Sequence, residues 1–356
     1  MSFYIKRKLK SMRKSIAKKF LDKKNRRSNI FDIGKVKSIL FFRNDDKIGD
    51  MVVSTLIFRE IKKYYPNIKI IVLCGKNNAE ILKYNRNVDE IYTTRDSFLK
   101  DLSIYVSLRK QRISLGIDFY TFGHCFISLL ILRIVNVSTL VGFYKDSYNI
   151  YDLSINKDFF NEHISKRYEH VLKILGIDNP NLDYDIFTSS KEDSIAIELL
   201  KKSNSKYNIV LNPFAASKHR SFSFDKLQSL VSILEKQINC SVFIINYKNN
   251  NNLLTLKNDK TFICRVDSVL KSASLIKYAD AVITPDTSIV HIAAAFNKKT
   301  VAFYLDYSKV SEKINVIWAP NNKNAISISV DAKDGLKSDI KNISNLCILD
   351  AVKKLL

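Results

Sequence analysis

The sequence predicts an α/β protein made of two doubly wound domains, and three observations support this fold class. Short apolar strands alternate with helical patterns from residue 38 to residue 305, and such alternation is typical of parallel sheets. The alternation occurs twice, on either side of a stretch at 177–206 that is rich in Asn, Asp, Pro and Ser. A length of 356 residues is enough for two domains, each with its own core.

We divide the chain on this basis. The predicted parts are a leader at 1–35, a first domain at 36–180, a linker at 181–206, a second domain at 207–335 and a C-terminal helix at 336–356.

In the first domain, apolar runs and helical spacing define the elements in order. The clearest helix is 50–64, where Val53, Ile57, Ile61 and Tyr64 recur at helical spacing before Pro66 ends the segment. We expect strands at 38–42, 69–74, 88–92, 115–120 and 139–142, and helices at 50–64, 77–84, 97–110, 123–136 and 163–176.

The second domain repeats this alternation. One helix near 191–203 lies inside the predicted linker, and a last helix follows residue 340. We expect strands at 208–212, 241–247, 261–265, 281–284 and 300–305, and helices at 224–237, 268–278 and 287–296.

The leader carries much of the net charge of +23. Residues 1–37 contain 14 Lys or Arg against Asp22 and Asp32, which gives +12. An apolar stripe at helical spacing (Ile5, Leu9, Met12, Ile16 and Phe20) predicts a basic amphipathic helix, which suits the surface of an anionic membrane. A disordered basic tail, or a general lysine bias of the composition, would explain the same charge.

Composition excludes several other classes of protein. The five cysteines are scattered, odd in number and without a C-x-x-C pair, which is typical of reduced thiols in the cytoplasm. The five histidines and the cysteines show no metal-binding spacing, so we expect neither a metal nor a cofactor. No apolar run is long enough to span a bilayer. No nucleic-acid-binding motif accompanies the positive charge, so a nucleic acid partner is not expected.

Two strand-to-helix turns carry candidate functional residues. The first, Arg43 to Asp50, follows the strand 38–42. This turn lies at the carboxyl ends of the strands, which is where doubly wound sheets bind their ligands. A carboxylate held there can accept a proton from a substrate hydroxyl. Asp50 is therefore a candidate general base, although Asp is also a preferred helix cap.

The second turn follows the strand 281–284 and contains Asp286, Thr287, Ser288 and His291. Free N–H groups and the dipole at a helix start favour a phosphate, and the two hydroxyl groups would add donors. The alternative is an ordinary capping turn followed by a buried histidine.

Together with a third segment, these turns resemble glycosyltransferase family nine, the ADP-heptose:lipopolysaccharide heptosyltransferases. The family patterns R-x-D-x-I-G-D and D-T-G-x-x-H are similar to Arg43–Asp50 and Asp286–His291. The third segment begins with Ile209–Ser217, which resembles the family's strand and small-residue loop, and continues with Arg220–Leu227, which is similar to the family's K-x-W-P-x-E-x-F/W pattern.

This resemblance implies the GT-B architecture, in which two Rossmann-like domains face each other across a cleft. It implies an inverting, metal-independent transfer of a heptose from ADP-heptose to the inner core of lipopolysaccharide, with Asp50 as the catalytic base. Arg220 aligns with the family's donor-binding lysine, and Lys218 lies near enough to share that role, together with Asp286, Thr287, Ser288 and His291. The leader would hold the enzyme at the inner face of the bacterial inner membrane, in contact with anionic lipid.

The acceptor's anionic groups would suit basic residues near Gly49, namely Arg43, Lys47 and Arg59. The sequence departs from the family at Ser288, Phe222-Ser223 and Leu305. Another nucleotide sugar, or a catalytically silent membrane-associated relative, therefore remains as an alternative.

Overall fold

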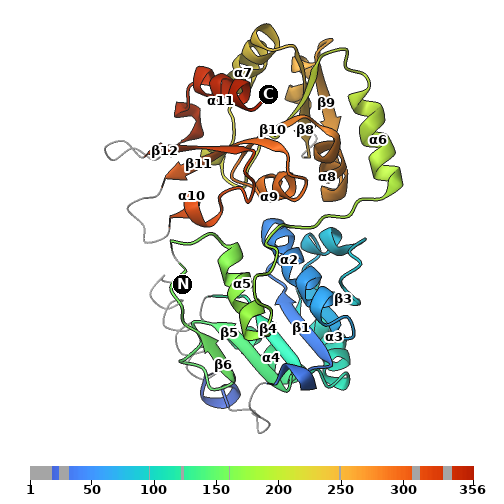
Figure 1. Ribbon diagram of the computed structural model, residues 1–356, viewed down its shortest axis with the longest axis vertical. Helices are drawn as coiled ribbons and strands as arrows, with labels where there is room; N and C mark the ends of the chain where they lie inside the picture. Colours follow the sequence, from blue (N-terminus) through green and yellow to red (C-terminus); the bar gives the residue numbers. More distant parts are fainter. Residues whose placement is uncertain are drawn as a thin grey trace, which may run out of the picture.

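The computed structural model describes residues 18–23, 32–95, 97–121, 124–159, 161–247, 250–306, 313–331 and 339–356. These residues form two α/β domains, one above the other in Figure 1, each built on a six-stranded parallel sheet. Most of the predicted leader helix lies outside the described residues, and only its end at 18–21 is described, as a helical turn.

The N-terminal sheet has the strand order β3-β2-β1-β4-β5-β6, and all its pairs are parallel. The chain reverses its direction of winding between β1 and β4, which is where ligands bind in such sheets. The strands are β1 (Ser38–Arg43), β2 (Lys69–Cys74), β3 (Glu90–Thr93), β4 (Leu115–Asp118), β5 (Thr139–Phe143) and β6 (Leu153–Ile155).

Helices cover both faces of this sheet. On one face, Ile39 and Phe41 of β1 pack with residues of α2 (Ile48–Tyr64) and α5 (Ser165–Ile174). On the other, Leu40 and Phe42 pack with α3 (Phe98–Lys110) and α4 (Phe126–Val135). Two 3₁₀ segments complete the domain, η1 (Ile33–Lys35) and η2 (Asn78–Leu82).

The C-terminal sheet repeats the same order from its other edge, as β12-β11-β10-β7-β8-β9, so its reversal lies between β7 and β10. All its pairs are parallel as well. The strands are β7 (Tyr207–Leu211), β8 (Cys240–Asn246), β9 (Thr261–Arg265), β10 (Ala281–Pro285), β11 (Lys299–Asp306) and β12 (Ala325–Asp331).

The helices of this domain again form two layers. One layer is α7 (Phe224–Gln237) with α11 (Asn345–Leu355), and the other is α8 (Val269–Tyr278) with α9 (Ser288–Ala295). The remaining segments are η3 (Lys218–Arg220), η4 (Asn251–Leu256), α10 (Ile314–Ile317) and η5 (Ile340–Asn342).

The predicted linker contains α6 (Ser190–Leu200), which packs on α8. Asp193 lies 2.7 Å from the Lys277 ammonium group and accepts a hydrogen bond from Ser274 at 2.9 Å. The part of the linker that forms α6 is therefore held against the C-terminal domain, and Figure 1 shows α6 beside α8.

The two domains are in direct contact. Helix α2 packs against α9, and one apolar cluster extends across the boundary, with Met51 and Val53 on one side and Ile289 and Ile292 on the other. The Ile164 amide also donates to the Ile317 carbonyl at 2.8 Å.

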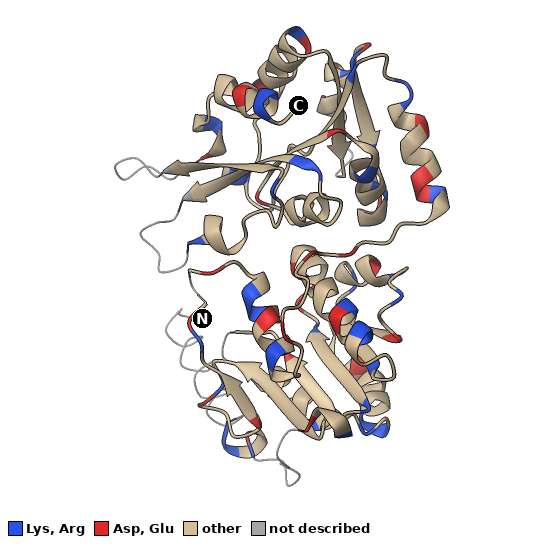
Figure 2. Ribbon diagram, viewed as in Figure 1, with Lys and Arg blue, Asp and Glu red and all other residues tan. Residues whose placement is uncertain are grey.

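Charged residues are distributed over both domains (Figure 2). Within the described residues, no helix combines the length and apolar character that crossing a membrane requires.

The structure confirms the predicted fold class and differs from the predicted elements in detail. The sequence did not predict β6, β12 or α10. The segment predicted as a helix at 77–84 forms only the 3₁₀ segment η2. Helix α2 begins at Ile48, two residues earlier than expected.

Candidate active site

At the reversal point of the N-terminal sheet, a buried arginine holds two carboxylates. Arg43 ends β1 with 3% of its side chain exposed, and its Nη2 lies 3.1 Å from both Asp50 Oδ1 and Asp45 Oδ2. Burial alone would lower the pKa of Arg43, but the Tyr168 hydroxyl and the two carboxylates outweigh it and raise this pKa. The guanidinium group is thus charged, and it fixes the position of the Asp50 carboxylate.

Asp50 is not the cap of its helix. Lys47 occupies the N-cap of α2 without a side-chain capping bond, and Asp50 lies in the first turn. Its side chain is 20% exposed. The carboxylate therefore remains accessible in part, while its charge is paired with Arg43 and favoured by the helix dipole.

Neighbouring loops hold the turn that precedes α2. Asp46 has a left-handed backbone (φ 57°), and its Oδ1 accepts a hydrogen bond from the Asn77 amide at 2.6 Å. Asn78 donates to the Arg43 carbonyl at 2.8 Å. A Cβ on Gly75 would lie 2.7 Å from Asp46 Cβ, so glycine is needed for this close approach. These contacts make the turn rigid, which is what a positioned base requires.

At the matching point of the C-terminal sheet, neutral groups fix the start of α9. Thr287 is the N-cap, and its hydroxyl accepts from the Ile289 amide at 3.3 Å. Asn212, just after β7, donates to Thr284 Oγ1 at 3.0 Å and to Thr287 Oγ1 at 3.2 Å. Ser288 is the first residue of α9. The N-terminus of α9 therefore lies beside the reversal point between β7 and β10. A helix N-terminus favours an anion.

A half-buried ion pair flanks this helix start. Arg220 Nη1 lies 2.9 Å from Asp286 Oδ2, and their side chains are 28% and 17% exposed. Burial raises the pKa of Asp286, and Arg220 opposes that rise. Lys218, on the same 3₁₀ segment, is exposed.

His291 lies at the contact between the domains. A Cβ on Gly49 would lie 3.0 Å from His291 Cδ2 and 3.6 Å from Ser288 Cα, so α2 and α9 approach each other closely at this glycine. The imidazole ring makes edge contacts with Tyr184 and Trp318. Burial lowers the pKa of His291 to about 4, which keeps the ring neutral at neutral pH. Among the described residues, no group hydrogen-bonds its buried Nδ1.

The structure therefore brings most of the predicted residues into two adjacent groups. Arg43, Gly49 and Asp50 lie on one side of the domain contact, and Ser288 and His291 meet Gly49 from the other. The acceptor role of Arg43 and Arg59 stays a prediction. Arg43 is buried against two carboxylates, and the Arg59 guanidinium lies 3.1 Å from Asp185 and donates to two carbonyls of the same segment. Lys47 is exposed, as an acceptor contact would require.

Sequence reasoning missed several polar groups at these edges. Asn212 was predicted as the last residue of the strand 208–212 and was given no role, although a polar residue at the end of a strand could have signalled one. Asp118 ends β4 and forms a buried cluster with Tyr151 and His124, whose Nε2 lies 3.3 Å from Asp118 Oδ2. The Asp after the apolar run 115–117 was the only sequence signal for this cluster.

Comparison with known proteins identifies the family of this chain. The family model "Glycosyltransferase family 9 (heptosyltransferase)" matches residues 107–345. The chain is 27% identical over 341 residues to the Escherichia coli K12 protein named "Putative lipopolysaccharide heptosyltransferase 4", covering 94% of this chain and 92% of that protein.

Two solved structures from Escherichia coli share the fold. ADP-heptose lipopolysaccharide heptosyltransferase II superposes with a TM-score of 0.71 at 18% identity, covering 89% of this chain and 98% of the other. Heptosyltransferase WaaC with ADP superposes with a TM-score of 0.68 at 14% identity, covering 90% and 100%. Because the family model matches more than half of the sequence, the chain belongs to glycosyltransferase family 9, the heptosyltransferases, and is a glycosyltransferase.

Proposed function

We propose that this enzyme transfers a heptose from ADP-heptose to the inner core of lipopolysaccharide, either to Kdo-lipid A or to a core heptose. The observation that carries this proposal is the Asp50 carboxylate, held by Arg43 in the first turn of α2 where that helix packs against α9. The relative solved with ADP supports an adenine nucleotide as the donor.

In this mechanism Asp50 acts as the general base. Its carboxylate accepts the proton of the acceptor hydroxyl while the hydroxyl oxygen attacks the anomeric carbon, and the bond to ADP breaks on the opposite face. One such displacement inverts the anomeric configuration and needs no metal. Arg43 contributes by holding the carboxylate in one position, since general bases act only within hydrogen-bond reach.

The departing diphosphate is assigned to the start of α9 and to Arg220. The start of α9 is the positive end of a helix dipole, and it would face a region where negative charge develops. Arg220 can bind phosphate oxygens with two parallel hydrogen bonds. Its present partner is Asp286, so phosphate binding would exchange one anionic partner for another. Lys218 is exposed close by and can add a further positive charge.

We also propose that the enzyme works at the cytoplasmic surface of the inner membrane, where a lipid-linked acceptor would lie. The basic leader supports this location, because its charge of +12 would be attracted to anionic lipid.

The direct test is incubation with ADP-heptose and a set of truncated lipopolysaccharide acceptors, read by mass spectrometry. We expect one added heptose on one acceptor of the set. No added heptose on any acceptor, with a folded protein that still binds ADP, would contradict the proposed acceptor class.

Ser288 favours testing a second donor. Where the family pattern has glycine, this serine adds a Cβ and a hydroxyl at the helix start. A thermal-shift series with ADP, UDP, GDP and CDP separates the two candidates. An unfolding temperature raised by ADP alone supports ADP-heptose as the donor. A larger increase with another nucleotide would indicate a sugar donor that carries that nucleotide.

A further inference from the structure

The outer face of α3 carries an apolar stripe that is exposed among the residues that the structure describes. Leu99, Leu102 and Val106 are spaced by three and four residues, and they are 80%, 37% and 39% exposed. The opposite side of α3 buries Tyr105 and Leu108 against the sheet. Helices on a domain surface usually present polar residues outward, so this second apolar stripe needs an explanation.

The polar residues exposed on α3 are basic or neutral. Lys100, Arg109 and Lys110 are exposed, whereas the helix's one carboxylate, Asp101, is 1% exposed and accepts from the Arg95 amide. The outward face of α3 thus combines apolar and positively charged groups.

Helix α5 on the other face of the sheet differs from α3. Its Lys166 and Lys173 both pair with Glu169, at 2.7 and 2.8 Å, and Figure 2 shows the two signs of charge together on that helix. Both helices contain three basic residues and one acidic residue. They differ in pairing, because Glu169 of α5 lies on its surface between two lysines, whereas Asp101 of α3 is buried beneath its exposed lysines and arginine.

Helix α4 extends this surface. It packs beside α3 on the same face of the sheet, and its first turn exposes Phe126 (42%) and Ile127 (48%). In a parallel sheet, helices that follow strands begin at the carboxyl edge. The exposed apolar residues at the starts of α3 and α4 therefore lie towards the same edge as Arg43 and Asp50.

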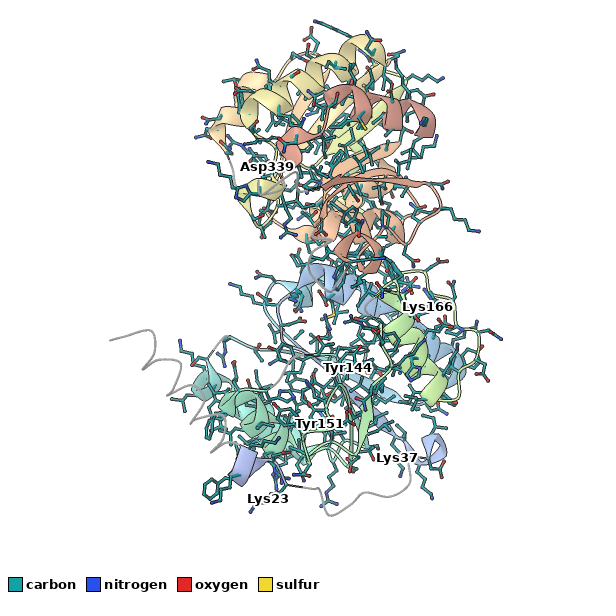
Figure 3. The ribbon with its side chains drawn as sticks, turned by 90° about the vertical axis from the view of Figure 1, so that its left-hand side faces the viewer. Lys23, Lys37, Tyr144, Tyr151, Lys166 and Asp339 are labelled. Carbon is teal, nitrogen blue, oxygen red and sulfur yellow. The ribbon has the colours of Figure 1, made fainter. Side chains whose placement is uncertain are left out.

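The leader joins the same layer of helices at the other end of α4, through the last turn of that helix. Arg133 of α4 donates to the Leu21 carbonyl at 2.7 Å and to the Lys23 carbonyl at 2.6 Å, and Asp22 accepts from the Ile150 amide at 2.9 Å. Figure 3 labels Lys23 on the N-terminal domain, at the end remote from the C-terminal domain. Phe20 is 63% exposed, and residues 1–17 contain six Lys or Arg and no Asp or Glu.

We propose that the outer face of α3 and the first turn of α4 dock on an anionic lipid bilayer, beside the leader. The apolar side chains would enter the boundary between headgroups and acyl chains, and the lysines and arginines would meet lipid phosphates. This docking would turn the carboxyl edge of the N-terminal sheet, with Asp50, towards a lipid-linked acceptor. Only that last orientation rests on the proposed function, because lipid binding itself needs neither donor nor acceptor.

The test uses the full-length chain and vesicle flotation. A triple variant, Leu99→Glu, Leu102→Glu and Val106→Glu, is compared with a matched control, Ile195→Glu, Leu254→Glu and Leu346→Glu, which changes three exposed apolar residues of the C-terminal half to the same charge. Vesicles of phosphatidylethanolamine with phosphatidylglycerol are compared with phosphatidylcholine vesicles, and thermal unfolding checks that both variants fold.

We expect the α3 variant to bind anionic vesicles at least tenfold more weakly than the control, and the wild type to bind phosphatidylcholine weakly. Equal binding of the two variants would overturn the proposal, since the leader alone would then account for membrane attachment. A wild-type dimer in solution that the α3 variant converts to a monomer would overturn it in another way, by assigning this face to a second copy of the chain. If the α3 variant fails to fold, Leu99→Glu alone, at the most exposed position, is the deciding variant.

Discussion

The two reversal points of this enzyme share a topology and differ in chemistry. In the N-terminal sheet, β1 and β4 lead to charged groups, with the buried Arg43 paired to Asp45 and Asp50. In the C-terminal sheet, β7 and β10 lead to a helix start fixed by the neutral groups of Asn212 and Thr287. The same strand order thus places two sites at equivalent edges, and the residues just after the strands decide what each one does.

This difference suggests a division of labour. A carboxylate with a fixed counter-ion suits proton transfer, whereas the positive end of a helix dipole suits a diphosphate. The predictions below test whether the two sites can be impaired separately.

The largest expected effect is on turnover when the base is removed. Asp50→Asn keeps the shape of the side chain but cannot accept the acceptor's proton, and general bases contribute about 10²–10⁴-fold. We expect the rate of heptose transfer to fall by about 10³-fold, measured by the release of ADP. A fall of less than tenfold would show that Asp50 is not the base.

The second-largest effect is expected for Arg43→Met, which should lower both the stability and the turnover of the enzyme. Arg43→Met leaves Asp45 and Asp50 without their buried counter-ion, and breaking a buried pair costs about 3–5 kcal/mol. We expect urea unfolding at a lower midpoint and a turnover reduced by at least tenfold. Lys166→Met, which breaks the more exposed pair with Glu169, is the control and should leave both nearly unchanged. Wild-type turnover in a folded Arg43→Met variant would rule out its positioning role.

His291 should make the enzyme less stable in acid. Its pKa is about 4 in the folded protein and about 6.5 in an unfolded chain, so only the unfolded chain gains this proton as the pH falls from 6.5 to 4. Stability from this residue is complete above pH 6.5 and decreases below it, by on the order of 3 kcal/mol at pH 4. Urea unfolding between pH 7.5 and 4.5 measures this loss.

His291→Asn should reduce that pH dependence without removing it. Burial also lowers the pKa values of His163 and His170, and these residues contribute in the same direction. An unchanged pH dependence in the variant would mean that His291 takes up its proton in the folded protein as well.

The smallest effect concerns the approach of the two domains. Gly49→Ala puts a methyl group 3.0 Å from His291 Cδ2, and overpacking of this kind costs about 1–3 kcal/mol. Gly34→Ala meets only the Asp32 side chain, at 3.2 Å, and is the control. In the double variant with His291→Ala, the cost of Gly49→Ala should largely disappear. If it persists, α2 and α9 are not in the contact described.

Much of the fold could be predicted because it depends on local patterns. Buried strands such as Ile39–Phe42 and amphipathic helices such as α2 show their periods directly in the sequence. The strand β6 has only three residues, which is too short for any period to appear. In β12, Ile326, Ile328 and Val330 do alternate with polar residues, so the signal of an edge strand was present and was overlooked.

The candidate site was predictable in location but not in its pairings. The two turns were found because Asp50 and Thr287 follow apolar strands. Arg43 and Asp50 lie on one turn, but the burial of Arg43 depends on residues distant in the sequence, such as Phe119, whose ring centroid lies 5.8 Å from the guanidinium carbon. That Asn212 reaches Thr287 depends on β7 and β10, which neighbour each other only in the folded sheet. Periodicity along the chain carries no information on such contacts.

The division of labour is tested most directly by ADP titration calorimetry on the wild type, Asp50→Asn and Arg220→Met under the same conditions. We expect the dissociation constant of ADP to stay within twofold of wild type in Asp50→Asn and to rise at least tenfold in Arg220→Met. Equal weakening in both variants would contradict the account, because the base and the diphosphate site would then not be separate.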